Sequence, residues 1–353
     1  MNIEYLDIVF SACLTLRGLH KIRLMQENNV YSMRPQLHIM LVAPFGMGKS
    51  SITKAMRNKY PSYIYPTDSF TRAGLEGSIG KDGDYVPSMI TKAGGKIMIV
   101  DEWNSLDYFA QQGLLSILEN QVFRRTIGFK VKKKYSFKSK YGRFDIKDNT
   151  IEGHMNFACV AYAMEYPMYK EEQKAKALLS RFSPLFIEPT QEMVEAIAMG
   201  DFKININDYG KEIKEVVITK EIYKQICGQF FSYLKEHNLL PQNTVDFGYM
   251  TRAMSDHIRL GVYNYMKQND VQEKNIEINE IKYFTEMLSC TDVLMKQFIN
   301  PQVQGKIYQF KQLVKESPNR DDRYYANRIG VSEEIIDVYK KKLGIGGEQN
   351  DGI

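Results

Sequence analysis

Residues 37–51 read LHIMLVAPFGMGKSS, and this stretch decides how the rest of the chain is interpreted. The apolar run from Leu37 to Val42 is typical of a buried strand. A loop with two glycines follows, and then a segment that favours a helix, Ser50 to Lys59. A strand, a glycine loop and a helix in this order are the context of a phosphate-binding loop. The unpaired amides of the loop and the helix dipole point at one place, so we expect an anion to bind there.

The individual positions predict a nucleotide site. Lys49 would contact the β- and γ-phosphates, and the Ser50 hydroxyl would ligate Mg²⁺. Ala43 stands where the pattern GxxxxGK[ST] has its first glycine, whereas the later positions fit. An ordinary strand–turn–helix that happens to contain GKS is the alternative, which the flanking sequence disfavours. The predicted nucleotide contacts are Pro44, Phe45, Gly46, Met47, Gly48, Lys49, Ser50 and Ser51.

A second apolar run, KIMIVDE at residues 96–102, ends in two acids. Four consecutive apolar residues are typical of a buried parallel strand, whose carboxyl end lies at the edge where open α/β sheets bind ligands. We expect Asp101 to hold Mg²⁺, directly or through water, and Glu102 to activate the attacking water. Such a strand is common by chance, but its pairing with the loop at Lys49 favours the functional interpretation.

Two further segments are predicted to form hairpins. In Ser69–Ile90, the sequence GKDG is a strong turn signal between short extended arms, and a plain surface hairpin is the alternative to a functional one. Between Arg124 and Arg143, nine Lys or Arg occur with no Asp or Glu, interleaved with aromatic residues. Because clustered cations bind phosphates and aromatic rings stack on bases, we expect nucleic acid to bind here, the alternative being a solvated charged hairpin. The predicted contacts are Arg124, Arg125, Lys130, Lys132, Lys133, Lys134, Lys138 and Lys140.

Composition narrows the class of protein. The 353 residues are 44% hydrophobic and 25% charged, as in globular proteins, and the net charge of +5 is smaller than the local excess at 124–143. The four cysteines form no CxxC pair and the five histidines are scattered, which argues against a disulfide framework or a metal cluster. Without a signal peptide or a long apolar run, we expect a soluble, cytoplasmic protein and no membrane span.

The flanking segments are predicted to be mainly helical. Apolar residues at helical spacing predict one amphipathic helix within residues 1–30. Asn156–Ala163 and the end of Leu178–Glu188 have the pattern of further strands, after which helices are expected. Tyr324–Ile345 has a helix-turn-helix pattern in which Ser332 caps the second helix. Acids at the start of that helix disfavour sequence-specific DNA binding.

Six segments in the same order resemble the AAA+ ATPase core of the minichromosome maintenance (MCM) replicative helicases, from about Ile39 to Leu260. They are APFGMGKS, SFTRAGLEGS, PSMITKAGGKIMIVDEWNSLD, LENQVFRRT, LLSRFSPLF and RAMSDHIRL, with Ser255 in place of the family's acid. The resemblance implies an α/β AAA+ P-loop NTPase core, in which helices sandwich a parallel sheet, with a helical lid and a C-terminal helix-turn-helix or winged-helix module. It also implies ATP and Mg²⁺ as cofactors and a ring of identical subunits, most simply a hexamer.

The resemblance assigns roles to further residues. Lys49 and Ser50 become Walker A, and Asp101 with Glu102 becomes Walker B. Arg181 matches the arginine finger offered to a neighbouring subunit, and Arg252 matches the sensor-2 arginine. In the family, a hairpin at the position of the basic segment enters the central channel and contacts DNA; Arg124, Arg125 and Lys130 fall in or beside it.

The chain also departs from the family pattern. Ala163 or Met164 stands where the family has its sensor-1 asparagine, and the basic segment is longer than its counterpart. The phosphate loop comes soon after Met1, which leaves no room for the family's N-terminal domain. A minimal MCM-like protein, of a virus or a mobile element, fits this arrangement.

We therefore predict an MCM-like ATPase that couples Mg-ATP hydrolysis at subunit interfaces to translocation on DNA, as a helicase in replication. Three alternatives stay open: a replication initiator or loader without unwinding activity, a protein-remodelling ATPase of the MoxR or McrB kind, and a nucleotide-gated binding module with weak hydrolysis. The predicted domains are an N-terminal helix packed on the core at 1–36, the AAA+ core at 37–189, the lid at 190–300 and the C-terminal module with a disordered tail at 301–353.

Overall fold

The structure is a computed structural model, and its chain divides into two compact units, Met1–Met295 and Lys296–Ile353. In the part of the chain that the structure describes, no helix is long and apolar enough to cross a membrane. The described residues are 3–27, 29–43, 46, 48–67, 70–80, 82, 84–126, 134–147, 149–164, 178, 180–187, 191–199, 203–210, 213–237, 239, 244–271, 273–298, 306–329, 331–343 and 345.

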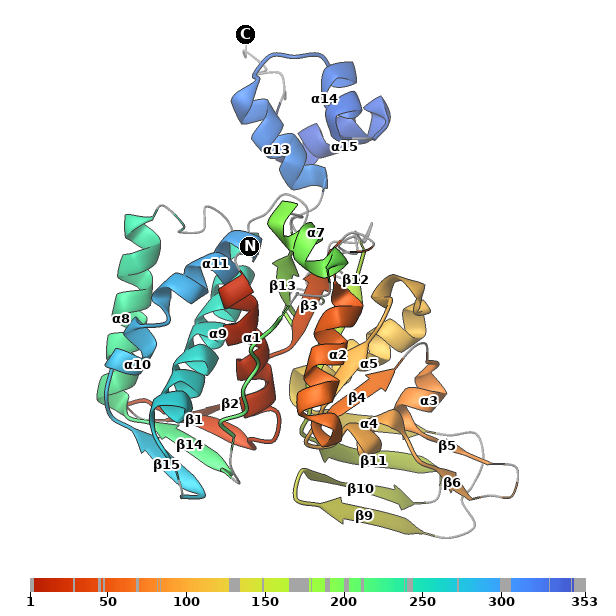
Figure 1. Ribbon diagram of the computed structural model, residues 1–353. Helices are drawn as coiled ribbons and strands as arrows, with labels where there is room; N and C mark the ends of the chain where they lie inside the picture. The colour runs from red at the N-terminus through yellow and green to blue at the C-terminus, as the bar shows by residue number, and fades with distance from the viewer. Residues whose placement is uncertain are drawn as a thin grey trace. The chain divides into compact units, whose positions relative to one another are not determined.

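A five-stranded parallel sheet lies at the centre of the first unit (Figure 1). Four of its strands are buried along their whole length, which explains their continuous apolar runs. The strands, in spatial order, are β13 (Ser183–Phe186), β3 (Ile39–Val42), β12 (Ala158–Ala163), β7 (Ile97–Val100) and β4 (Ile64–Thr67). Along the chain, β3 comes first and is followed by β4 at the far edge of the sheet. The chain then returns through β7 and β12, and the last strand, β13, pairs with the other side of β3.

Helices follow the strands of this sheet, as the sequence predicted. Helix α2 (Lys49–Lys59) follows β3 and buries Ile52 and Met56 in the same core as α1 (Ile3–Leu16). Helix α5 (Tyr108–Asn120) follows β7 and begins where the Asp107 side chain accepts a hydrogen bond from the Ala110 amide, 2.8 Å long. The shorter helices are α3 (Arg72–Glu76), α4 (Met89–Ala93), η1 (Pro61–Tyr63) and η2 (Trp103–Ser105).

A second sheet corrects one expectation from the sequence. The predicted helix within residues 1–30 ends at Leu16, and the chain continues as β1 (Lys21–Met25) and β2 (Val30–Met33). The region after the central sheet is mainly helical, as predicted, and it also contributes β14 (Glu215–Ile218) and β15 (Asn275–Ile278), giving the order β15-β14-β1-β2. β1 forms because it pairs in parallel with β14, almost 200 positions later, which no local periodicity shows.

Helices of the same region share the core of the first unit. They are α7 (Gln191–Ala198), α8 (Lys220–Glu236), α9 (Thr244–Gln268), α10 (Lys282–Thr285) and α11 (Leu288–Phe298), the last of which crosses the division between the units. Between α7 and β14, residues 203–208 have no regular structure.

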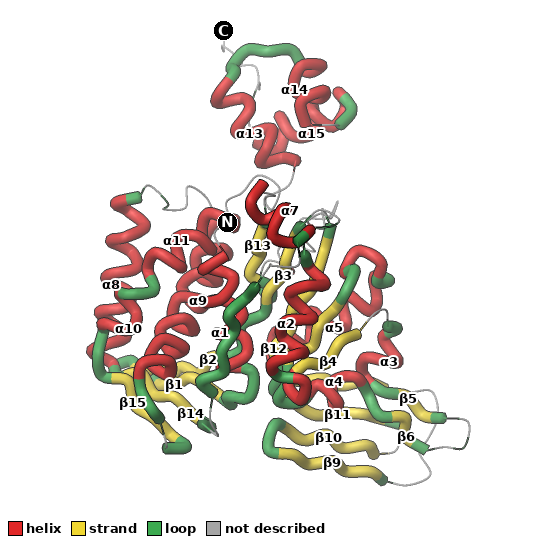
Figure 2. Tube along the Cα trace, viewed as in Figure 1, coloured by secondary structure: helices red, strands yellow, loops and turns green. Residues whose placement is uncertain are grey.

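Two segments of the first unit were predicted to form hairpins, and the structure agrees with this for the first and differs for the second (Figure 2). The first forms the predicted hairpin, β5 (Ser78–Ile79) with β6 (Tyr85–Val86). The basic segment belongs to a four-stranded antiparallel sheet rather than to a single hairpin, because β8 pairs with β11 and not with its neighbour in sequence. Its strands are β8 (Val122–Thr126), β9 (Tyr135–Ser139), β10 (Gly142–Lys147) and β11 (Thr150–Met155), in the order β8-β11-β10-β9. We call it the inserted sheet.

The second unit contains three described helices around a small core. They are α13 (Lys306–Glu316), α14 (Asp322–Ile329) and α15 (Glu333–Leu343). Phe310, Tyr325 and Ile336 are among its buried residues. Helices α14 and α15 lie where the helix-turn-helix pattern was predicted, and residues 306–329 and 331–343 contain no strand, so a winged-helix fold stays a prediction.

Candidate nucleotide site

The loop after β3 has the backbone of an anion-binding site. Gly48 has φ +73° and precedes α2, and Gly46 has φ +81°; an L side chain is strained at both positions. The N-cap residue of α2 is Gly48, which has no side chain that could accept from the first amides of the helix, and helix N-termini of this kind bind anions. A Cβ built on Gly46 meets no atom within 4 Å, which leaves space for a ligand. Pro44, Phe45 and Met47 lie outside the described residues.

Lys49 joins two strand ends of the central sheet. Its Nζ donates to the carbonyl of Ala43, at 2.9 Å, and to that of Ala163, at 3.5 Å. Burial lowers the pKa of Lys49, and the nearby charges of Asp101 and Glu102 act in the opposite direction. The structure therefore brings the loop cation close to both predicted acids, at the carboxyl edge of the sheet.

The two acids occupy a sharp bend after β7. The Asp101 carboxylate accepts a hydrogen bond from the Glu102 amide, at 3.1 Å. Glu102 has φ +54° and ψ +57°, a left-handed conformation that costs a non-glycine residue about 1–2 kcal/mol. Ser105 fixes the bend, since its hydroxyl donates to the Glu102 carbonyl at 2.8 Å, and Trp103 is fully buried beneath it. The bend leaves the Glu102 side chain exposed at the sheet edge.

These groups fit Mg-ATP. Open amides and Lys49 supply donors for phosphate oxygens, while the exposed Ser50 and the half-buried Asp101 supply the oxygen ligands that Mg²⁺ prefers. Strand β3, where the strand order reverses, is also where open α/β sheets bind ligands. Among the described residues no group of three or more His, Cys, Asp or Glu side chains could hold a metal ion.

Arg181 lies at the opposite edge of the sheet. It comes two residues before β13, whose first residue, Ser183, is in register with the first residue of β3. A four-residue strand is ~13 Å long, so the loop after β3 is at the far end. Arg181 donates to the Leu115 carbonyl at 3.3 Å and forms an ion pair with Glu119, on α5. Its side chain is 16% exposed.

Arg252 lies at this same edge and is 5% exposed. Its guanidinium donates to Asp256 at 3.1 Å, to the Ser183 hydroxyl at 3.2 Å and to the Ser180 carbonyl at 3.5 Å. It thus holds the turn that carries Arg181 and does not meet Lys49 of its own chain. Its sensor role stays a prediction.

A buried charge cluster surrounds Arg252, and sequence reasoning missed it. Asp256 is fully buried and also accepts from Arg259, at 2.7 Å, while Arg259 donates to the Arg34 carbonyl at 3.0 Å. Burial and the other guanidiniums lower the pKa of Arg259 to about 10 and that of Arg34 well below its usual value. The spacing of Arg252, Asp256 and Arg259 along one helix was the available signal.

The predicted nucleic-acid contacts that the structure describes do not all face the same way. Arg124 faces outward and pairs with Glu152 at 3.6 Å, whereas Arg125 faces inward, donates to the Gly77 carbonyl at 3.1 Å and lies near Glu76. Arg125 therefore serves to pack the inserted sheet on α3. The exposed predicted contacts on or beside β9 are Lys134, Lys138 and Lys140, and Lys130, Lys132 and Lys133 lie outside the described residues.

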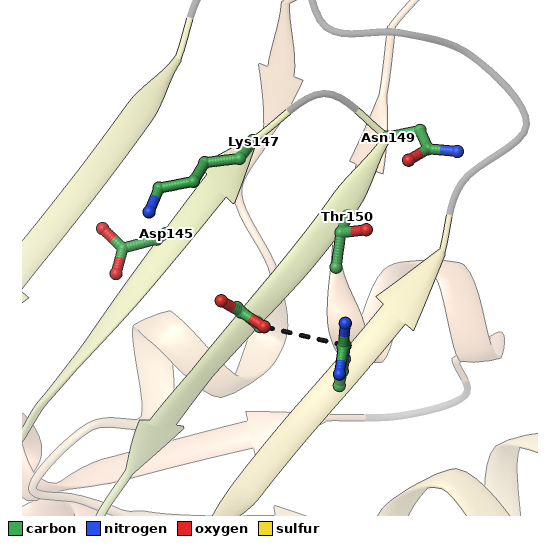
Figure 3. Close-up of a pocket in the computed structure, with 6 residues that line it drawn as sticks. Asp145, Lys147, Asn149 and Thr150 are labelled. Carbon is green, nitrogen blue, oxygen red and sulfur yellow. Dashed lines mark ion pairs between the residues drawn. The ribbon is translucent and has the colours of Figure 1, made fainter.

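The outer face of the inserted sheet carries both signs of charge. A shallow hollow there is lined by side chains of β8, β10 and β11 and of the turn between the last two (Figure 3). Arg143 pairs with Asp145 at 2.8 Å, so Asp145 and Glu152 each have an arginine partner. The lining residues are Arg124, Asp145, Lys147, Asn149, Thr150 and Glu152.

Residues 38–182 match the family model of the AAA domain, dynein-related subfamily. The match covers the phosphate loop, both acids and four of the five central strands, and it supports an AAA+ ATPase that binds and hydrolyses ATP. It does not distinguish the MCM helicases from other AAA+ proteins. No curated protein matches the chain.

Proposed function

We propose that this chain is an AAA+ motor that hydrolyses Mg-ATP between two copies of itself. One observation carries the proposal: the residues of the predicted site lie at opposite ends of the parallel strands of one sheet. Lys49 lies with Asp101 and Glu102 at the carboxyl edge, whereas Arg181 lies beyond the amino end of β13. A cation at that distance serves a phosphate only on a neighbouring copy, which favours a ring.

Each residue then has a defined task. The loop amides and Lys49 bind the phosphates, Asp101 and Ser50 orient the metal, and Glu102 takes the proton of the attacking water. Mg²⁺, when bound, neutralises charge on the phosphates. Arg181 stabilises the charge that develops on the neighbour's phosphate, a contribution on the order of 10³ or more in rate.

A subunit-mixing experiment tests the shared site. Lys49→Ala and Arg181→Ala should each abolish turnover, and Arg181→Ala should keep nucleotide binding. Mixed in equal amounts, the two variants should regain roughly a quarter of wild-type activity, because a head-to-tail interface then combines an intact Lys49 with an intact Arg181. If Arg181→Ala alone is fully active, or if mixing restores nothing although mixed oligomers form, the shared site is wrong.

We further propose that the motor acts on DNA, in an MCM-like role as a replicative helicase. The support is the row of exposed lysines on and beside β9, Lys134, Lys138 and Lys140, next to the local excess of cations at 124–143. Replacing Lys134 and Lys138 with Ala should weaken DNA binding and flatten its salt dependence. The matched control replaces Lys235 and Lys274, two exposed lysines outside the inserted sheet. An unchanged affinity and salt slope would exclude this surface.

The mixed charge of the outer face favours a second candidate, a remodelling ATPase whose inserted sheet binds another protein. Arg124 and Arg143 are each paired with an acid, so that face offers both signs to a partner. ATPase rates with and without single- and double-stranded DNA separate the candidates, since a remodelling ATPase is indifferent to DNA. A strand-displacement assay separates a helicase from an initiator or loader, which separates no duplex.

A further inference from the structure

Tyr162 lies on the strand between the phosphate loop and the acids. In β12, Ala161 is in register with Val100 of β7, so Tyr162 comes next to Asp101; on the other side it is in register with Leu41 of β3. Strand residues alternate between faces. Tyr162 is therefore a cross-strand neighbour of Asp101 on the same face of the sheet.

That face is the one covered by α2. Val160 and Ile99, one alternation before Tyr162 and Asp101, share a core with Ile52 of α2. The Thr53 hydroxyl of α2 donates to the Tyr162 hydroxyl at 2.8 Å. The phenol, 1% exposed, thus lies under the helix whose first turn carries Lys49.

The Tyr162 hydroxyl has a proton to donate. The Thr53 hydroxyl has one proton and lies 2.8 Å from the Tyr162 oxygen and 3.4 Å from the Lys49 carbonyl. The shorter bond takes that proton, which leaves the phenol its own proton to donate, as a buried phenol normally does. A phenol is protonated at neutral pH, so this hydroxyl is a donor on the same face of the sheet as the Asp101 carboxylate. Of the described residues of β7 and the position that follows it, Asp101 is the acid next to Tyr162.

The end of β12 offers no alternative polar side chain. Ala163 is buried and has no polar atom, and Met164 is 57% exposed. At the end of β12, Tyr162 is therefore the residue whose polar side chain can orient Asp101.

We propose that Tyr162 is the positioning residue of the metal carboxylate: its hydroxyl, held by Thr53, donates to Asp101 through one water and fixes the orientation in which Asp101 meets Mg²⁺. This inference rests on the proposed ATPase function. The phenol does not touch the nucleotide, and its effect is transmitted through Asp101.

Tyr162→Phe tests the inference, because it removes one oxygen and keeps the ring. We expect the Mg²⁺ concentration for half-maximal ATPase to rise roughly tenfold, as for a lost hydrogen bond to a charged group, and kcat to fall. The KM for ATP at saturating Mg²⁺ should stay within about twofold, because the loop and Lys49 are untouched. A second readout needs no turnover: the part of the ATP-induced rise in Tm that depends on Mg²⁺ should shrink.

Two variants separate positioning from packing. Thr53→Val breaks the bond to the Tyr162 hydroxyl but leaves the phenol beside Asp101, so its Mg²⁺ requirement should change far less. Tyr263→Phe makes the same chemical change at another buried tyrosine and should leave the requirement unchanged.

The outcomes are distinguishable. If the wild type neither hydrolyses Mg-ATP nor gains Tm from nucleotide, the proposed function fails and the inference falls with it. If the wild type is active and Tyr162→Phe keeps its Mg²⁺ requirement, the inference alone is wrong. If Tyr162→Phe and Thr53→Val lower Tm equally and leave the Mg²⁺ requirement unchanged, the pair is structural and the inference is also wrong.

Discussion

At the scale of single residues, Glu102 combines an exposed carboxylate with a strained backbone. Its left-handed conformation is stabilised from outside, by the bonds of Ser105 to its carbonyl and by the buried Trp103. Strain that surrounding contacts over-determine is a frequent property of functional sites. The apolar run of β7 predicted where the acids lie, but the direction of the Glu102 side chain depends on this bend.

Glu102→Gln should separate binding from hydrolysis. The amide keeps the shape of the side chain but cannot accept a proton, so turnover should fall on the order of 10²–10⁴-fold while ATP binding stays close to wild type. ATPase rates and equilibrium nucleotide binding measure the two effects. Glu152→Gln, an exposed acid on β11, is the control and should stay active; near-normal turnover of Glu102→Gln would show that another group is the base.

The contribution of Asp256 to stability is visible only from its burial in the folded structure. It is the acceptor shared by Arg252, Arg259 and Ser183, all buried. Asp256→Asn should lower the free energy of unfolding by about 3–5 kcal/mol, because two buried guanidiniums lose their counter-charge. Chemical denaturation measures the change. Asp337→Asn, in the second unit, is the control, and a loss below about 1 kcal/mol for Asp256→Asn would mean that the arginines find other partners.

At the scale of elements, aromatic rings help to dock the inserted sheet on the rest of the first unit. The Tyr141 ring, in the turn between β9 and β10, lies against Gly95, just before β7, and against Gly18, after α1. Elsewhere Tyr85 of β6 packs on Tyr135 and Phe144, with ring centroids 5.6 and 5.2 Å apart. The sheet therefore contacts the start of the strand that ends in the acids.

Gly95→Ala tests the first contact. Gly95 has φ +70°, and a Cβ there would lie 2.2 Å from the Tyr141 ring, so we expect a loss of about 1–3 kcal/mol in the free energy of unfolding. Gly228→Ala is the matched control: a Cβ there meets nothing within 4 Å, and Gly228 lies in helix α8, so this change should stabilise by about 0.5–1 kcal/mol. Equal Tm values for the two variants would contradict the docking.

At the scale of the whole molecule, buried neutral histidines make stability depend on pH. His257 is fully buried, its Nδ1 lies 2.8 Å from the Thr291 hydroxyl, and burial lowers its pKa to about 4. Burial also lowers the pKa of His38, whose Nδ1 accepts from the Cys159 amide at 3.1 Å. The unfolded chain protonates these rings first, near pH 6.5.

Stability should therefore fall as the solution becomes acidic. The contribution of His257 is complete above pH 6.5 and is lost as pH falls toward 4, by about 3 kcal/mol in total. His257→Asn should be less stable at pH 7 but should show a flatter decline between pH 7 and 5, measured by denaturation at each pH. His154→Asn, an exposed histidine on β11, should keep the wild-type slope; an unchanged slope in His257→Asn would contradict the assignment.

The sequence by itself determined the glycine loop after β3, the strand that ends in Asp101 and Glu102, three other strands of the central sheet and the helix after Gly48. Each of these is encoded in a short window, as a continuous apolar run or as glycines where the backbone needs positive φ. Only the tertiary structure decided that β1 pairs with β14, that the basic segment joins a four-stranded sheet, that Arg125 faces inward and that Tyr162 lies beside Asp101. Strand register and burial depend on which distant segments meet, because a one-residue shift in pairing moves every side chain to the other face.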